Sequence, residues 1–183
     1  MSKVYEEIDD KLAAWLLAQP MFFVSTAPLA GDGHVNVSPK GMAGTFAVLG
    51  SHRVAYLDYF GSGAETIAHL RENGRIAFMW CAFSGPPKIV RLHGRGSVVL
   101  PDDPAFPALR AEFAKEREKA VRSIIVADID RVSDSCGYSV PNLEFVQDRD
   151  ILDLRQLRRP DEYYEEYAKT RNATSIDGLP ALG

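Results

Sequence analysis

The sequence has few cysteines, no excess of positive charge and no long apolar run, and each shortage excludes a class of protein. Only two cysteines occur in 183 residues, Cys81 and Cys136. They lie far apart and form no C-x-x-C motif, so we expect free, unreactive thiols rather than a disulfide framework. The 21 Lys and Arg residues are outnumbered by 25 Asp and Glu residues, and the net charge is −4. Without a cluster of basic residues, we expect no binding to nucleic acid.

No stretch reaches the roughly 18 continuous apolar residues of a membrane-spanning helix. Residues 1–18 begin with charged side chains, which is not the pattern of a signal peptide, so we expect a cytoplasmic protein with no membrane partner. The four histidines show no spacing with Cys, Asp or Glu that is typical of a zinc site. We therefore predict no structural metal.

The sequence does contain a series of runs rich in Val, Ile, Phe and Tyr, separated by Gly, Ser and Pro, as is typical of strands. They lie at residues 21–27, 34–38, 46–49, 53–59, 75–83 and 88–100. The first two flank Gly31-Asp32-Gly33, which indicates a hairpin. Six closely spaced strands predict a closed or nearly closed antiparallel barrel.

Helical patterns lie on both sides of these strands, and residues 123–133 return to a strand pattern. An apolar stripe predicts a leading helix over about residues 4–18, ended by Pro20. Residues 101–121 are charged and helical, and residues about 150–171 indicate one or two exposed helices. The tail up to residue 183 has the composition of an extended arm, a segment that often lies on a partner subunit. The chain is thus expected to form one domain, residues 1–183, mainly β with peripheral helices.

The most informative stretch is residues 56–80, where one apolar strand leads into Gly61-Ser62-Gly63, a short helix and a second apolar strand. The start of a helix offers unpaired N–H groups and a positive dipole end, which suit a phosphate. Ser62, Gly63 and Thr66 open this helix, while Ser38 and Lys40 end a nearby strand. The alternative is a capping box between Ser62 and Glu65, with no ligand.

Four segments together resemble the pyridoxamine 5′-phosphate oxidase-like family: residues 35–41, 54–58, 61–62 and 68–76. The resemblance implies a flavin-binding split β-barrel that forms a homodimer with two FMN molecules at the subunit interface. Each phosphate would lie near the helix after the Gly-Ser turn. The cofactor-binding residues that follow from the resemblance and the turn are Ser38, Lys40, Gly41, Ser62, Gly63, Thr66 and Arg91.

The sequence departs from the family pattern in two places. Many relatives have Arg or Lys directly after the Gly-Ser pair, whereas this chain continues with Gly63-Ala64-Glu65. The missing positive charge must come from Lys40, Lys88 or Arg91, and we prefer Lys40 because it lies in a matching segment. The oxidases also carry C-terminal Arg, His and Trp residues that hold pyridoxal phosphate, and residues 176–180 do not match them. The vitamin-oxidase activity is therefore not carried over.

The resulting hypothesis is an FMN-dependent oxidoreductase that acts on an unknown small molecule. No catalytic residue is predicted, because the flavin itself supplies the redox chemistry. A deazaflavin-dependent reductase is one alternative, since the phosphate-side residues cannot distinguish the two cofactors. Another is a non-catalytic module that binds flavin or haem, with His93 or His69 as the haem ligand. His69 follows Glu65 by four residues, so the two also fit an ordinary pair on the helix surface.

Overall fold

A computed structural model describes residues 3–183 and contains eight strands and five helices. The strands are β1 (Lys3–Tyr5), β2 (Met21–Thr26), β3 (Asn36–Gly41), β4 (Phe46–Gly50), β5 (Arg53–Tyr59), β6 (Arg75–Cys81), β7 (Ile89–Val99) and β8 (Val121–Ser135). The helices are α1 (Asp10–Leu17), α2 (Glu65–Asn73), α3 (Phe106–Arg110), α4 (Ile151–Leu157) and α5 (Asp161–Thr170). None of the described helices is long and apolar enough to cross a membrane.

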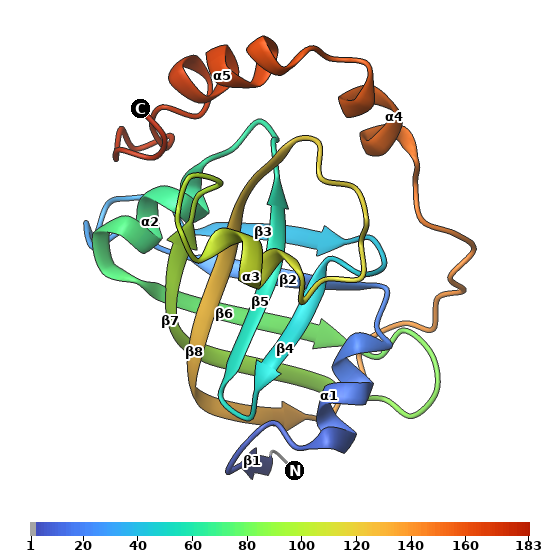
Figure 1. The fold of residues 1–183 in the computed structure, drawn as a ribbon. Helices are drawn as coiled ribbons and strands as arrows, with labels where there is room; N and C mark the ends of the chain where they lie inside the picture. The colour runs from blue at the N-terminus through green and yellow to red at the C-terminus, as the bar shows by residue number, and fades with distance from the viewer. Residues whose placement is uncertain (1–2) are drawn as a thin grey trace.

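The strands form one antiparallel sheet in the order β3-β2-β6-β7-β8-β5-β4, and β1 pairs with β8. The sheet curls on itself, so that β3 at one edge lies close to β5, as Figure 1 shows. An ion pair between Lys40 of β3 and Asp58 of β5 spans this approach. The predicted split antiparallel barrel is confirmed, and the predicted hairpin around residues 31–33 is formed by β2 and β3.

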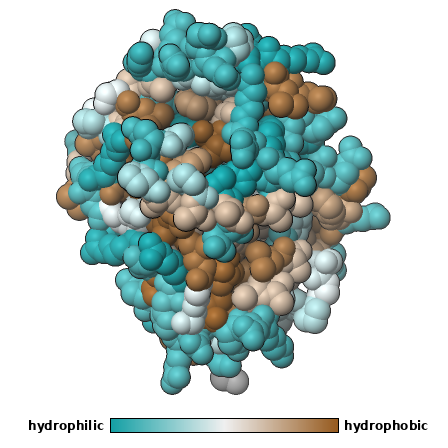
Figure 2. Space-filling model, in the orientation of Figure 1, coloured by the Kyte–Doolittle hydropathy of each residue, from teal (hydrophilic) through white to brown (hydrophobic). Residues whose placement is uncertain are grey.

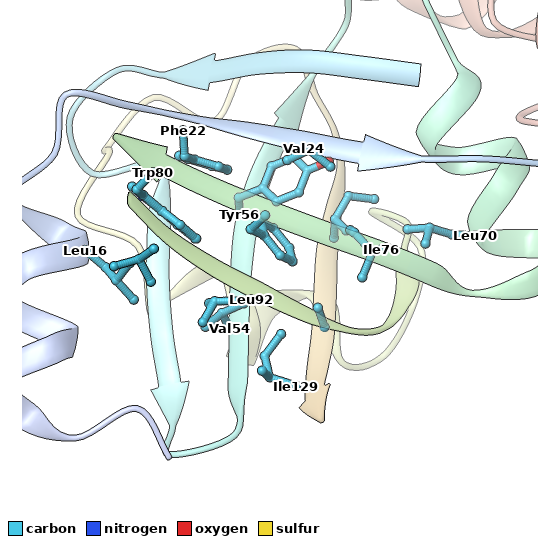
Figure 3. Close-up of a cluster of buried hydrophobic side chains, with 14 of the residues drawn as sticks. Leu16, Phe22, Val24, Val54, Tyr56, Leu70, Ile76, Trp80, Leu92 and Ile129 are labelled. Atoms are coloured by element: carbon cyan, nitrogen blue, oxygen red, sulfur yellow. The ribbon is translucent and has the colours of Figure 1, made fainter. Parts of the chain in front are cut away.

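The core fills the inside of the curl with alternate side chains of each strand. Along β2, Phe22 and Val24 are buried, while the residues between them are partly exposed. Phe22 packs against Trp80 of β6 and Tyr56 of β5, with ring centroids 5.2 and 5.8 Å apart. Figure 3 shows these rings gathered between the strands. These three aromatic side chains therefore pack in the core of the barrel, which is the usual role of aromatic residues in strands.

An irregularity in the pairing of β7 with β8 depends on a glycine. The register between β7 and β8 shifts between His93 and Gly94, and a Cβ on Gly94 would collide with the backbone of Asp128 and lie 2.9 Å from Cα of Ile129. We expect Gly94→Ala to lower the free energy of unfolding by about 1–3 kcal/mol, because the clash is with backbone that cannot move aside. Urea unfolding measures this loss. Gly50→Ala, where a Cβ meets nothing within 4 Å, is the control, and equal stability of both variants would contradict the explanation.

The predicted leading helix is too long at its N-terminal side. Residues Lys3–Tyr5 form β1, and α1 begins only after Asp9, whose carboxylate accepts a hydrogen bond from the backbone N–H of Leu12 at 2.7 Å. Asp is among the best N-cap residues, so the helix start is set by this side chain rather than by the apolar stripe. Val4 of this stripe lies instead in β1, which pairs with β8, and Ile8, which lies between β1 and α1 in the sequence, packs into the core.

The region of residues 101–121 was expected to be helical, but only Phe106–Arg110 forms a helix. Pro101 and Pro104 precede it, and prolines interrupt helices because they lack an N–H group. After α3 the chain is held instead by a second apolar cluster around Phe113 and Leu57, and by a hydrogen bond from Lys115 N to Gly44 O of 3.0 Å. Helices α4 and α5 confirm the prediction for residues 150–171.

The C-terminal tail folds back onto its own chain instead of extending away from it. Asn172, Ser175 and Ala181 are buried, and the Arg71 side chain of α2 donates a hydrogen bond to the carbonyl of Ala181. Asn172 donates to the carbonyl of Gly61 at 3.1 Å. The predicted extended arm is thus wrong for this chain, because buried polar contacts tie the tail to α2 and to the turn before it.

Candidate functional site

The turn between β5 and α2 carries the predicted phosphate-binding residues. Helix α2 begins after Ala64, and no side chain caps its N-terminus. The alternative of a capping box between Ser62 and Glu65 is therefore wrong. Instead, the Glu65 carboxylate folds back over Gly63, into the space that a Cβ at this position would need. Ser62 is exposed, so its hydroxyl faces solvent beside the turn.

A buried cluster of charges lies directly behind this turn. Asp58 of β5 is 1% exposed and accepts hydrogen bonds from Lys40 at 3.1 Å, from Arg122 Nε at 2.8 Å and from Ser123 Oγ at 3.2 Å. Burial acts to raise the pKa of Asp58, but the charges and hydrogen bonds of Lys40 and Arg122 together hold it below its usual value. Two cations surround one carboxylate, so the cluster has a surplus of one positive charge.

Arg122 is the residue in this cluster that sequence reasoning missed. Besides Asp58, its Nη1 donates to the carbonyl of Gly63 at 2.8 Å and to the side-chain oxygen of Asn172 at 2.9 Å. It thereby joins β8, the Gly61-Ser62-Gly63 turn and the C-terminal tail. A signal was present, because an arginine in the apolar run of β8 must find partners when it is buried.

Hydrogen-bonded polar side chains also link β2 and β3 to α2. Asn36 accepts from Ser38 at 3.0 Å and donates to Thr66 at 3.1 Å, and Thr26 bonds Nδ1 of His69 at 3.0 Å. Two predicted residues, Ser38 and Thr66, are thus brought together through Asn36. His69 is fully buried, so the predicted surface pair with Glu65 is wrong, and burial lowers the pKa of its imidazole.

A pocket of about 380 Å³ opens on the other side of the turn, between it and helices α4 and α5. We call it the arginine–tyrosine pocket. Its lining residues are Phe60, Gly61, Ser62, Leu152, Arg155, Gln156, Arg159, Tyr163, Tyr164 and Tyr167. Figure 1 shows α4 and α5 arching over the end of the barrel where the turn lies. Of the predicted residues, only Ser62 lines this pocket.

Contacts between rings and polar groups shape the arginine–tyrosine pocket. The Gln156 side-chain amide donates to the backbone carbonyl of Phe60 at 2.9 Å. The backbone carbonyl of Gln156 accepts from the Tyr164 hydroxyl at 2.7 Å. The side-chain oxygen of Gln156 is buried without a hydrogen-bond partner. The Arg159 guanidinium lies over the ring of Tyr163, 4.7 Å from its centroid. The pocket therefore offers cations and ring faces to a ligand.

The remaining predicted residues lie elsewhere. Arg91 of β7 pairs with Ser133 of β8 and donates to the Ser135 hydroxyl at 3.0 Å; Ser133 is eleven residues along β8 from Arg122. Lys88, another candidate cation, lies 5.0 Å from the ring centroid of Trp15. Gly41 lines a separate, larger cavity. Arg91 is thus not brought to the turn, because β7 carries it toward the other end of β8.

Metal ligands and thiols add nothing to the site. Among residues 3–183, no group of three or more His, Cys, Asp or Glu side chains is placed to hold a metal ion. Cys81 and Cys136 are free, the first buried and the second exposed. The Arg, Lys, Ser and Tyr side chains around the turn are of the kinds that bind anionic groups and pack against rings.

The tail is also held by an exposed pair, His34 and Asp177. His34 Nδ1 lies 2.6 Å from Asp177, and its backbone N–H donates to the other carboxylate oxygen at 2.8 Å. The hydrogen bond and charge of Asp177 raise the pKa of His34 above 6.5, and the same contact lowers the pKa of Asp177 below 3.8. Between pH 3.8 and pH 6.5, His34 is therefore protonated and Asp177 deprotonated, so that the two side chains form an ion pair.

We expect the tail to open as the pH rises. The His34 contribution is fully present below its unfolded pKa of 6.5 and is lost as pH rises through the higher folded pKa. The Asp177 contribution is present above 3.8 and is lost only in acid. Hydrogen exchange of the amides of Gly178, Leu179, Ala181 and Leu182, corrected for intrinsic rates, should show less protection at about pH 9 than at about pH 5.5. His34→Gln should remove this difference, and a difference that persists in that variant would contradict the assignment.

The fold and the site now define a class of protein: a split β-barrel with a polar site beside the helix that follows β5. The model of the family described as pyridoxamine 5′-phosphate oxidase matches residues 8–136. The chain is 41% identical to the pyridoxamine 5′-phosphate oxidase family protein ustO of Aspergillus flavus, over 97% of this chain and 77% of that protein. The chain belongs to the pyridoxamine 5′-phosphate oxidase family.

A solved structure supports the same fold. HupZ of Group A Streptococcus superposes with a TM-score of 0.55 at 15% identity, over 75% of this chain and 99% of HupZ. An FMN-binding protein from Syntrophomonas wolfei is also similar, with a TM-score of 0.49 at 14% identity, over 74% of this chain and 84% of that protein. At these identities the matches concern the course of the backbone.

Proposed function

We propose that the protein binds FMN and serves as a flavin-dependent oxidoreductase, with the phosphate held between the Gly61-Ser62 turn and Arg155 and Arg159. The observation that carries this proposal is the arginine–tyrosine pocket, which opens directly onto the turn. Membership of the pyridoxamine 5′-phosphate oxidase family supports it. When bound, the flavin supplies hydride and electron transfer, and the protein supplies position and electrostatics.

Charge decides on which side of the turn the phosphate binds. At Gly63 itself the folded-back Glu65 carboxylate would repel an anion. On the other side, Arg155 and Arg159 provide two cations without a carboxylate among the lining residues. Arginine recognises phosphate oxygens well because its planar guanidinium offers several donors. The two arginines therefore replace the cation that follows the Gly-Ser pair in many relatives.

The earlier candidates keep supporting roles in this proposal. Lys40 is 24% exposed at its side chain, and with Arg122 it leaves a net positive charge behind the turn. Ser38 and Thr66 are joined through Asn36 on the same side. Tyr163, Tyr164 and Tyr167 supply ring faces to the pocket. These groups would attract and orient a flavin nucleotide. Gly41 and Arg91 are left out, because Gly41 lines the separate cavity and Arg91 lies toward the other end of β8.

The proposal leaves out oxidation of pyridoxamine phosphate, because residues 176–180 lack the Arg, His and Trp pattern of the oxidases.

The proposed protein is a homodimer. Ile151, Leu154 and Leu157 of α4 are exposed, and Figure 2 shows apolar side chains on this helix. Exposed apolar side chains that gather on one helix often mark a contact with another chain. The cytoplasmic location remains a prediction.

The absorbance spectrum of the freshly purified protein, followed by titration with FMN, tests the proposal. A bound flavin gives two visible bands, and we expect either these bands or saturable binding of added FMN. Parallel titrations with a deazaflavin and with haemin cover the alternatives. His69 is a poor haem ligand because it is fully buried and bonded to Thr26. A colourless protein that binds no FMN would overturn the proposal.

A further inference from the structure

A second, larger cavity lies apart from the arginine–tyrosine pocket. Its volume is about 930 Å³, near the upper end of the range typical of small-molecule sites. The end of α1, the turn between β3 and β4, the end of β6 and residues 143–148 enclose it. None of the residues that line the arginine–tyrosine pocket lines this cavity, so the two could be filled at the same time.

Aromatic and aliphatic side chains form one wall of the cavity. Trp80 packs on Phe22 with ring centroids 5.2 Å apart and nearly parallel planes, and Phe46 meets Trp80 at 5.1 Å with planes at 67°. Figure 3 shows Leu16 of α1 beside Trp80 in the same cluster. Phe83 lines the cavity as well. Such a wall favours a ligand with an apolar body, and ring faces also attract cations.

The charged lining residues are all acidic. Glu112, Glu144 and Asp148 line the cavity, and within residues 3–183 none of its lining residues is Lys, Arg or His. One carboxylate oxygen of Asp148 already accepts a hydrogen bond, from the backbone N–H of Ala43 at 3.0 Å. A cavity with this lining repels phosphate and carboxylate groups and attracts a positive charge.

The end of α1 adds negative potential from an independent source. Leu17 and Ala18 at its C-terminus line the cavity, and the last turn of the helix contains no basic residue. The final carbonyl groups of a helix lack partners within it and carry the negative end of its dipole. The carbonyl groups of α1 and the carboxylates of the lining therefore both make the electrostatic potential of the cavity more negative.

The turn between β3 and β4 is held in an uncommon conformation where it borders the cavity. Met42 has φ of 72°, in the left-handed region that non-glycine residues rarely adopt. Gly44 has φ of 79°, and its carbonyl accepts a hydrogen bond from Lys115 N at 3.0 Å. Strained residues of this kind persist where the surroundings hold them, and they gather at ligand sites.

We propose that this cavity binds an apolar or aromatic amine in its cationic form. The hydrocarbon part would lie against Phe46 and Phe83, which are partly exposed and line the cavity in front of the buried Trp80, and the ammonium group would lie toward Glu112 and Glu144. The ligand is thus unlike a phosphorylated vitamin, which the acidic lining would repel. This inference does not depend on flavin binding, because it rests on a different cavity.

Three indole compounds that differ only in the charge of their side chain test the proposal: tryptamine, tryptophol and indole-3-propionate. Isothermal titration of the full-length protein should give saturable binding of tryptamine. We expect its affinity to exceed that of neutral tryptophol by about tenfold, with indole-3-propionate weaker still, given the usual strength of a cation among carboxylates and ring faces. Equal affinity for all three compounds, or no binding of tryptamine, would overturn the proposal.

Removal of the acidic groups sharpens the test. The double variant Glu112→Gln/Glu144→Gln should weaken tryptamine about fivefold and leave tryptophol unchanged, since only the charged contact is lost. The control Glu118→Gln/Asp130→Asn removes two exposed carboxylates outside the cavity and should leave both affinities as they are. If the control weakens tryptamine as much as the first double variant, general surface charge explains the binding and the proposal fails. FMN titration of the same samples reports separately on the flavin site.

Discussion

Replacement of Arg122 by methionine is expected to lower the free energy of unfolding by about 3–5 kcal/mol, the usual loss when one partner of a buried ion pair is removed. Arg122 has 4% side-chain exposure, and its change would deprive Asp58, Gly63 and Asn172 of hydrogen bonds at once. Lys40 alone would remain to balance the buried carboxylate. The effect is large because the charge of Asp58 cannot reach water.

Urea unfolding measures this loss, and Arg53→Met is the matched control. Arg53 also pairs with an aspartate across the sheet, Asp128, but both side chains are more than half exposed, at 54% and 73%. We expect the control to change the free energy of unfolding by less than about 1 kcal/mol. If Arg122→Met is no more destabilising than Arg53→Met, the cluster does not hold the barrel and the turn together as described.

The double variant Arg155→Ala/Arg159→Ala is expected to lower the affinity for FMN about 30- to 150-fold. This range corresponds to about 2–3 kcal/mol, a conservative value for two charged contacts with one phosphate. Both arginines line the arginine–tyrosine pocket, whereas Arg158 between them is exposed and outside it. Fluorescence titration with FMN measures the change.

Arg158→Ala provides the control, because it removes the same side chain from the same end of α4. Its affinity for FMN should equal that of the unaltered protein within about threefold, as expected for a surface charge. Riboflavin, which has no phosphate, should bind the double variant as well as it binds the unaltered protein. A loss of riboflavin binding equal to the loss of FMN binding would mean that the arginines act on the fold rather than on the phosphate.

The sequence predicted the parts of the fold that depend on local patterns. The hairpin of β2 and β3, the passage from β5 through α2 to β6, and the two helices near the C-terminus follow from strand composition, turn glycines and helical periodicity. The start of α1 was misplaced because one side chain, Asp9, outweighs an apolar stripe. The predicted capping box failed because Glu65 folds back over Gly63 while no side chain caps α2.

The site was harder to predict because its groups come from distant parts of the chain. Arg122 and Asp58 meet across 64 residues of sequence, and Arg155 and Arg159 reach the Gly61-Ser62 turn only because α4 lies over the end of the barrel. No local spacing encodes such contacts. Lys40 and Ser62 were predicted because they lie in segments whose order resembles the family, and Thr66 was predicted because it opens the helix after the turn. Arg91 was predicted beside them, but β7 carries it toward the other end of β8.

The most direct test of the account compares the affinities of the unaltered protein for FMN and riboflavin under the same conditions. The two ligands share the isoalloxazine ring and differ in the phosphate, which is the group that the Gly61-Ser62 turn and the two arginines are proposed to hold. The account predicts that FMN binds at least about 30-fold more tightly, and that the difference shrinks with rising salt concentration as charges are screened. Equal affinity for the two compounds would contradict it.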